Sequence, residues 1–208
     1  MSEKKTHAPD LKKHLSALYP DATVSVTADT CVLAIDQAAM KKPFTSLLNT
    51  LRDDPHCAFE QLIDITAIDR LHYGLSEWKD SDQLIDEGFL RAVETSSLTA
   101  PSDKNTPRFV LVLHLLSLKH NHRLRLKLSL KGDCPTAESA TETWPAADWY
   151  EREVYDLFGV TFNNHPDLRR ILTDYGFVGH PFRKDFPVHG RVDLSYDEKA
   201  KRCVYKPV

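Results

Sequence analysis

The sequence predicts an α+β domain that continues into an extended C-terminal arm. Leucines alternate with polar residues from Arg123 to Leu130, and this period of two is typical of a half-buried strand. Apolar residues recur with helical spacing in residues 10–19 and 43–52. Residues 160–208 lose regular periodicity but keep many Phe, Leu and Tyr side chains, which is unlike a simple disordered tail. We therefore expect this arm to bury its aromatic side chains against another subunit.

The bulk composition excludes several classes of protein. A length of 208 residues suits one ordinary domain with an extension, or two very small domains. The formal net charge of −3 supplies no positive field, so we expect no nucleic acid as a partner. The first ten residues have no apolar core of a secretory signal, and no apolar run approaches the roughly 18 residues of a membrane span. We expect a soluble chain that reaches a membrane only through a partner.

The cysteines predict neither a disulfide framework nor a metal centre. They are far apart in the chain and contain no C-x-x-C pair, which is typical of a reducing compartment. A zinc or iron–sulfur site needs ligand spacing that none of these pairs has. The four residues are Cys31, Cys57, Cys134 and Cys203.

The first seventy residues predict two helices and three strands. Residues 10–19 have the apolar spacing of a short helix, and residues 22–26 and 31–35 are β-rich runs that suggest a hairpin. Residues 43–52 form a second helix, with a proline suited to its first turn. Residues 59–69 are a strand candidate, rich in Ile and Leu.

The middle of the chain combines an irregular segment with the clearest hairpin. Residues 70–107 are rich in Ser, Asp, Glu and Thr, and we interpret them as an excursion from the sheet that carries a small helix or packs on a neighbouring protein. Residues 109–118 and 123–130 predict two paired strands. His120 and His122 lie in the turn between them, so we expect both to be exposed.

A further helix is expected before the arm. Residues 137–158 are helical in character, although a proline interrupts them. Asp148 suits a cap of the later part, and Gly159 sits where a left-handed residue ends a helix. Arg152 and Asp156 are spaced to pair across one helical turn. We divide the chain into an α+β domain, 1–145, and a signature helix with an extended partner-binding arm, 146–208.

The acids of this helix allow two interpretations. Glu151, Glu153 and Asp156 with Arg152 could perform acid–base chemistry, because paired carboxylates beside an arginine tune one another. The alternative is a salt-bridged helix face or an interface network. No recognisable nucleophile lies nearby, and the chain has no nucleotide, flavin or hydrolase motif. The interface interpretation is therefore the stronger.

The histidines and basic pairs of the arm also favour structure over chemistry. His165 and His180 could ligate a metal, but their spacing matches no compact metal motif. Each precedes a proline, which biases it to an extended conformation and suits a turn. Acidic residues interrupt the basic pairs Arg169-Arg170 and Arg183-Lys184, which favours ion pairs across a protein interface over phosphate binding.

Three runs between Glu151 and Pro187 resemble the signature of a known family. They read EREVYDLFG, HPDLRRIL and GHPFRKDFP, and they are similar to the 30 kDa subunit of respiratory complex I, the NADH-quinone oxidoreductase. The close likeness covers residues 149–187, and weaker likeness extends over most of residues 55–190. Two positions differ from the usual pattern, Asp148 for Asn and Phe182 for Leu.

The resemblance implies a compact mixed β-sheet with flanking helices, followed by the extended arm. It implies a non-catalytic structural subunit of the peripheral arm of a proton-translocating enzyme. That enzyme passes electrons from NADH through FMN and iron–sulfur clusters to quinone, whereas this chain itself holds no cofactor. The implied partner is chiefly the 49 kDa-type subunit, and the implied place is the cytoplasmic side of the bacterial inner membrane, reached through the complex.

We assign no residue to catalysis, cofactor or metal, and we expect one set of residues to form the partner interface. Its polar members are Glu151, Arg152, Glu153, Asp156, Arg169, Arg170, Arg183, Lys184 and Asp185. Its apolar members are Phe158, Phe162, Leu168, Tyr175, Phe177 and Phe186. Two alternatives stay open: a homologous subunit of a membrane-bound hydrogenase or F420-type dehydrogenase, and a free-standing metal-dependent enzyme that uses His165 and His180.

Overall fold

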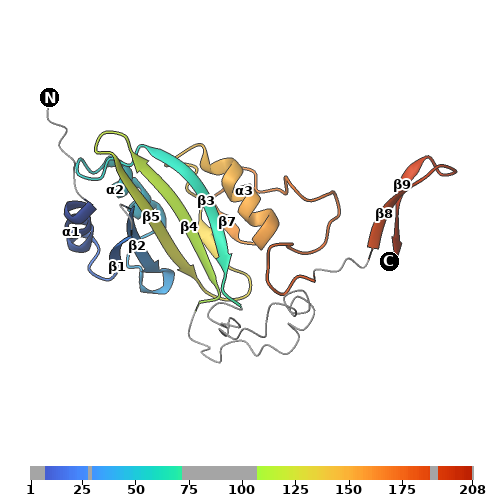
Figure 1. The fold of residues 1–208 in the computed structure, drawn as a ribbon, viewed down its shortest axis with the longest axis horizontal. Coiled ribbons are helices and arrows are strands. Elements are labelled where there is room, and N and C mark those ends of the chain that lie inside the picture. The colour runs from blue at the N-terminus through green and yellow to red at the C-terminus, as the bar shows by residue number, and fades with distance from the viewer. Residues whose placement is uncertain (1–7, 28–29, 72–106, 188–191, 208) are drawn as a thin grey trace, which may run out of the picture.

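A five-stranded mixed sheet forms the centre of the protein, in a computed structural model that describes residues 8–27, 30–71, 107–187 and 192–207 (Figure 1). Strands β2 and β5 are parallel, and the other neighbouring pairs are antiparallel. In spatial order the strands are β1 (Thr23–Thr27), β2 (Thr30–Asp36), β5 (His122–Leu130), β4 (Phe109–Ser117) and β3 (Gln61–Asp69).

Strand register gathers the apolar side chains on one face of this sheet. Leu111 lies opposite Leu128 and Leu113 opposite Leu126, and all four are buried. Apolar residues of three helices pack into the same core cluster. Figure 1 shows α1 near the β1–β2 edge and α3 near β3, in agreement with their contacts. The helices are α1 (Ala8–Leu18), α2 (Phe44–Asp53) and α3 (Ala147–Phe158).

Smaller elements complete the described chain. A 3-10 turn, η1 (Gln37–Ala39), follows β2 and is capped by the Asp36 carboxylate. Strands β6 (Thr136–Glu138) and β7 (Thr161–Asn163) flank α3 in sequence and pair in parallel. Strands β8 (Val192–Asp197) and β9 (Arg202–Pro207) form an antiparallel hairpin of their own.

The predicted α+β fold with a mixed sheet and flanking helices is confirmed. The expected first two helices, both hairpins and the strand before residue 70 are all present within a few residues of their predicted bounds. Residues 72–106, most of the proposed excursion, lie outside the described residues. Side chains from both sides of residue 145 share the core, and the division of the chain there stays a prediction.

Three local predictions were wrong. The start of residues 137–158 is not helical, because residues 136–138 pair with β7, a long-range partner that local propensity does not reveal. The arm contains the β8–β9 hairpin, which the irregular sequence did not indicate. His122 is buried, since it begins the inward-facing register of β5 and its ring stacks on that of His120 at 5.5 Å.

Candidate functional site: helix α3 and the strap

Helix α3 ends at a glycine that the fold requires for two reasons. Gly159 has φ +72°, a left-handed conformation that residues with a Cβ adopt only at a cost. A Cβ at this position would also lie 2.6 Å from side-chain atoms of Arg183 and His180. Gly159 therefore ends the helix, as the sequence predicted, and allows a distant part of the chain to approach. We call that part, residues 164–187, the strap.

The strap completes the hydrogen bonding of the C-terminal end of α3. His180 Nδ1 donates to the carbonyl of Asp156 at 2.9 Å, and the Phe182 N–H donates to the carbonyl of Leu157 at 3.0 Å. Arg183 Nε donates to the carbonyl of Phe158 at 2.6 Å. These carbonyls have no partner inside the helix, and a guanidinium at this end also opposes the negative pole of the helix dipole.

Asp156 is the buried anchor of the strap. One carboxylate oxygen accepts the backbone N–H groups of Ile171, Leu172 and Thr173, at 3.1, 2.8 and 2.8 Å. The other accepts the Thr173 hydroxyl and Arg170 Nη1. Burial acts to raise the pKa of Asp156, but the bonds from Thr173 and the neighbouring N–H groups outweigh it and lower the pKa to about 2.

These bonds show that the predicted Arg152–Asp156 ion pair was wrong, and they give the reason. Asp156 does not pair with Arg152 across the helix, because Arg170 and the strap backbone occupy its carboxylate. Arg152 is buried instead, with its guanidinium 4.8 Å from the centre of the Trp149 ring and Nε 3.4 Å from the Arg169 carbonyl. The spacing of Arg152 and Asp156 allowed an ion pair, but Arg170 of the strap bonds Asp156 instead.

A second ion-pair cluster ties the far end of the strap to the sheet. Arg108 donates to both carboxylate oxygens of buried Asp69, at 2.9 and 2.7 Å, and approaches the Asp185 carboxylate at 3.0 Å. The Lys184 N–H also donates to Asp69. Burial acts to raise the pKa of Asp69, but the bonds from Arg108 outweigh it, and the pKa is lowered. Asp69 and Arg108 were not among the predicted site residues, since neither lies in a recognisable motif.

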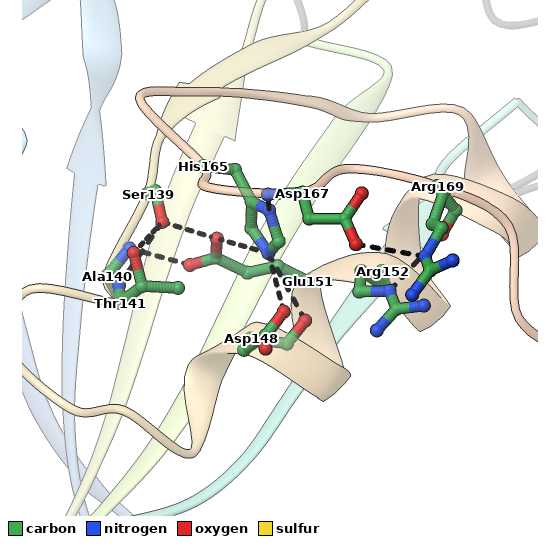
Figure 2. A network of polar contacts seen from close by, with 9 residues as sticks. All are labelled: Ser139, Ala140, Thr141, Asp148, Glu151, Arg152, His165, Asp167 and Arg169. Atoms are coloured by element: carbon green, nitrogen blue, oxygen red, sulfur yellow. Dashed lines mark hydrogen bonds and ion pairs between the residues drawn. The ribbon is translucent and has the colours of Figure 1, made fainter.

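The N-terminal half of α3 holds a third buried polar network (Figure 2). Glu151 accepts the Ala140 N–H at 2.6 Å and the Ser139 hydroxyl at 2.7 Å. Nδ1 of His165 accepts the Asp167 N–H, so its proton lies on Nε2, which donates to the Asp148 carbonyl at 3.2 Å. Burial raises the pKa of Glu151 to about 7. The predicted cap at Asp148 was wrong, because Ala146 is the N-cap and Asp148 lies in the first turn.

These polar groups hold the strap and α3 together, and their chemistry does not suit acid–base catalysis. The Asp156 and Asp69 carboxylates are ionised and already accept several hydrogen bonds, so neither is a general acid near neutral pH. Glu151 titrates near neutrality but is enclosed. His165 and His180 each donate a ring N–H to a backbone carbonyl, and the His180 carbonyl accepts the Arg183 N–H in a turn. In the described ranges, one group of side chains with metal-ligand chemistry occurs, and it lies outside the strap.

The outer side of the strap carries several large exposed apolar side chains among its charged residues. Tyr175 is 99% exposed and Val178 is 89% exposed. Leu172, Phe182 and Trp149 of α3 are also exposed. Large apolar side chains held outward in this way are the kind of surface that proteins use for contact, so these residues are candidates for the partner interface. Trp149, Leu172, Val178 and Phe182 were absent from the predicted interface set, because sequence alone does not show which strap residues face outward.

The predicted interface residues fall into three environments in the structure. Five are buried inside this chain: Glu151, Arg152, Asp156, Phe158 and Phe162. Five are half-buried along the strap: Leu168, Arg170, Phe177, Arg183 and Phe186. Five are exposed: Glu153, Arg169, Tyr175, Lys184 and Asp185. Their role in partner contact stays a proposal, and the exposed group is the part able to touch a partner directly.

The fold and the strap together define an α+β protein with buried polar anchors and an outward apolar face, the class of an assembly subunit. Residues 37–192 match the family described as respiratory-chain NADH dehydrogenase, 30 Kd subunit. The chain belongs to this family. It is 51% identical over 180 residues to the C subunit of NADH-quinone oxidoreductase from Coxiella burnetii, covering 85% of this chain and 79% of that protein. It is 49% identical over 158 residues to the corresponding protein of Legionella pneumophila, covering 76% of this chain and 69% of that protein.

Two solved structures share the fold. A trypsin-resistant fragment of Nqo5 aligns with a TM-score of 0.52 at 22% identity, covering 76% of this chain and 98% of the fragment. A chain of an archaeal membrane-bound sulfane sulfur reductase aligns with a TM-score of 0.57 at 21% identity, covering 86% of this chain and 85% of that chain. Within the described ranges, every helix is too short or too polar to serve as a membrane span.

The Asp156 anchor predicts that Asp156→Asn destabilises the protein. An amide keeps one acceptor oxygen but presents N–H groups to other donors, so we expect the free energy of unfolding to fall by about 2–4 kcal/mol. Trypsin should then cut faster after Arg169 and Arg170. Urea denaturation and timed proteolysis measure both effects. Asp167→Asn removes an exposed strap carboxylate that pairs with Arg169, and it should cost less than about 1 kcal/mol. An equal fall in the free energy of unfolding in both variants would contradict the role of Asp156 as the anchor.

The environment of Glu151 predicts a specific pH dependence. Its pKa is raised from 4.5 to about 7, so the folded state binds the extra proton, and the free energy of unfolding falls as pH rises through this window. In the natural chain the decline should reach on the order of 3 kcal/mol, and Glu151→Gln should abolish it because glutamine does not titrate. Urea denaturation at a series of pH values measures the slope for each variant. Glu153→Gln changes an exposed acid two residues away and should keep the original slope; identical slopes in all three proteins would refute the assignment.

Proposed function

We propose that the chain is a non-catalytic structural subunit in the peripheral arm of a proton-translocating NADH-quinone oxidoreductase. Membership of the family and the relatives at about half identity support this assignment. The observation that supports a structural role is the set of exposed apolar side chains on the strap. Buried bonds to α3 hold the strap backbone in place, and these side chains stay exposed on the side away from α3. FMN and iron–sulfur clusters, which carry the electrons from NADH to quinone, belong in this proposal to other subunits.

The partner we propose is the 49 kDa-type subunit. Its contact would centre on Tyr175 and Val178, with Leu172 and Phe182 beside them. Lys184 and Asp185 would lie at the polar rim, since both are exposed at the end of the strap. An apolar centre with a charged rim is the usual anatomy of a stable protein interface. Through this contact the chain would lie on the cytoplasmic side of the bacterial inner membrane.

The buried members of the predicted interface set act indirectly in this proposal. Arg183 holds the carbonyl at the end of α3, and Asp156 holds the strap backbone. They determine the shape of the surface that the partner meets. The likeness to the archaeal reductase, at 21% identity, is one of fold, so it does not favour the related-complex alternative over an NADH-quinone oxidoreductase.

The proposal predicts that substitutions of outward-facing strap residues lower complex assembly without lowering the stability of the chain, whereas substitutions of inward-facing residues lower both. The double substitution Tyr175→Asp and Val178→Asp should leave the melting temperature of the free chain unchanged and lower the assembled complex at least tenfold, because charges enter an apolar contact. Solubilised membranes resolved by native electrophoresis, with NADH-quinone activity measured per assembled complex, give the result. Leu118→Asp, at an exposed apolar residue of the β4–β5 turn, is the matched control and should assemble normally.

The substitution Arg183→Ala should lower both the melting temperature and assembly, since it leaves a helix carbonyl without its partner. Losing a hydrogen bond from a charged donor to a carbonyl costs roughly 1.5–3 kcal/mol. Arg152→Ala should behave likewise, because its buried guanidinium holds the strap carbonyl of Arg169. Activity should fall only in proportion to assembled complex. Normal assembly with lost quinone reduction in either variant would overturn the structural assignment and restore a catalytic role.

A further inference from the structure

Three side chains with metal-binding chemistry meet outside the strap, where α1 lies against the turn that follows α2. A ring nitrogen of His14, a carboxylate oxygen of Asp54 and the Sγ atom of Cys57 all lie within 4.8 Å of one another. Within this group, His14 Nε2 and Asp54 Oδ2 are 3.1 Å apart. Distant parts of the sequence thus deliver a nitrogen, an oxygen and a sulfur ligand to one point.

The backbone holds these ligands in place before any ion binds. Asp54 ends α2, and its carbonyl accepts the Cys57 N–H at 3.0 Å and the Ala58 N–H at 2.8 Å, which closes a tight turn. Its Oδ1 atom accepts the His56 N–H at 2.7 Å, so the carboxylate is oriented with Oδ2 toward His14. On the other side, the buried Leu11 and Leu15 fix α1 in the core.

The donor set suits a borderline-soft transition metal. Imidazole nitrogen, carboxylate oxygen and thiolate sulfur are the ligands of Zn²⁺, whereas Mg²⁺ and Ca²⁺ prefer oxygen alone. Zinc bonds of about 2.0–2.3 Å require ligand atoms roughly 3.3–3.8 Å apart. The His14–Asp54 pair at 3.1 Å would open slightly, and contacts of up to 4.8 Å would contract by about 1 Å. Three protein ligands leave the fourth tetrahedral position to water, as in zinc sites with an open position.

Two simpler interpretations of these three groups are an enzyme site and an ion pair beside a core cysteine. Cys57 is fully buried, and its thiol pKa is raised to about 12 by burial, so it is not a nucleophile of a Cys–His–Asp enzyme. A plain ion pair explains His14 and Asp54 and leaves Cys57 as a member of the hydrophobic core, so metal binding is the property that separates the two interpretations. The side chains of His14 and Asp54 are 29% and 15% exposed, so two of the three ligand groups can be reached from solvent.

We propose that His14, Asp54 and Cys57 form a binding site for one zinc-type divalent metal ion, which ties α1 to the turn after α2. Binding displaces the thiol proton to solvent, and the two anionic ligands neutralise the ion. The sequence predicted no metal ligands, because closely spaced pairs are the signal that a linear pattern offers. Here His14 is forty residues from Asp54 in the chain, and proximity arises only in the fold.

Cobalt titration of the full chain tests this site, using protein without a polyhistidine tag. We expect one Co²⁺ per chain, with a thiolate-to-cobalt charge-transfer band in the near ultraviolet that Zn²⁺ abolishes by displacement. Zn²⁺ should also raise the melting temperature of the chain, since it binds only the folded state. Cys57→Ser should lose the charge-transfer band, and His14→Gln should weaken Co²⁺ binding at least tenfold.

Cys134→Ser is the matched control, because Cys134 is an exposed free thiol away from these residues in sequence. It should bind Co²⁺ like the natural chain. If Cys57→Ser fails to fold, His14→Gln decides, since His14 is partly exposed and its substitution leaves the core intact. No charge-transfer band in the natural chain, a band that survives Cys57→Ser, or full-strength binding by His14→Gln would each overturn the proposal.

Discussion

The Asp156 carboxylate is the contact on which the strap depends. Placed on the inner side of α3, it would be a costly buried charge without partners, because desolvation penalises an ion in the protein interior. Three backbone N–H groups, one hydroxyl and one guanidinium of the strap satisfy it. The carboxylate therefore requires the strap to fold back, and the strap in turn has its irregular backbone satisfied without a strand or helix of its own.

The other contacts extend this arrangement along the strap. Gly159 lets the chain approach the end of α3, and His180 and Arg183 then bond carbonyls that the helix leaves open. Arg108 and Asp69 secure the far end to the sheet. The inner polar groups of the strap are held by these bonds, whereas its exposed side carries charged residues such as Arg169 and Lys184 together with the apolar Tyr175 and Val178. A mixed surface of this kind is what the proposed role in assembly requires.

The sequence predicted the elements whose pattern is local. Alternation of leucines located β5, helical spacing located α2, and Gly159 marked the end of α3, since each depends on neighbours a few residues away. The features that the sequence did not predict depend on contacts between residues far apart in the chain. The pairing of β6 with β7 replaced a local helix, Arg170 displaced Arg152 from Asp156, and His14 meets Cys57 only after α1 and α2 pack. For the proposed interface, the sequence did not show which residues of the segment face inward, and its role in partner contact stays a prediction.

In this structure the strap is folded on α3 without any partner bound. Hydrogen exchange of the free, full chain at neutral pH, resolved to the backbone amides of Ile171, Leu172 and Thr173, tests it directly. These three N–H groups donate to the buried Asp156 carboxylate, so we expect exchange at least a hundredfold slower than in an unstructured peptide. Exchange at the rate of an unstructured peptide would contradict the claim and would mean that the strap takes this shape only against its partner.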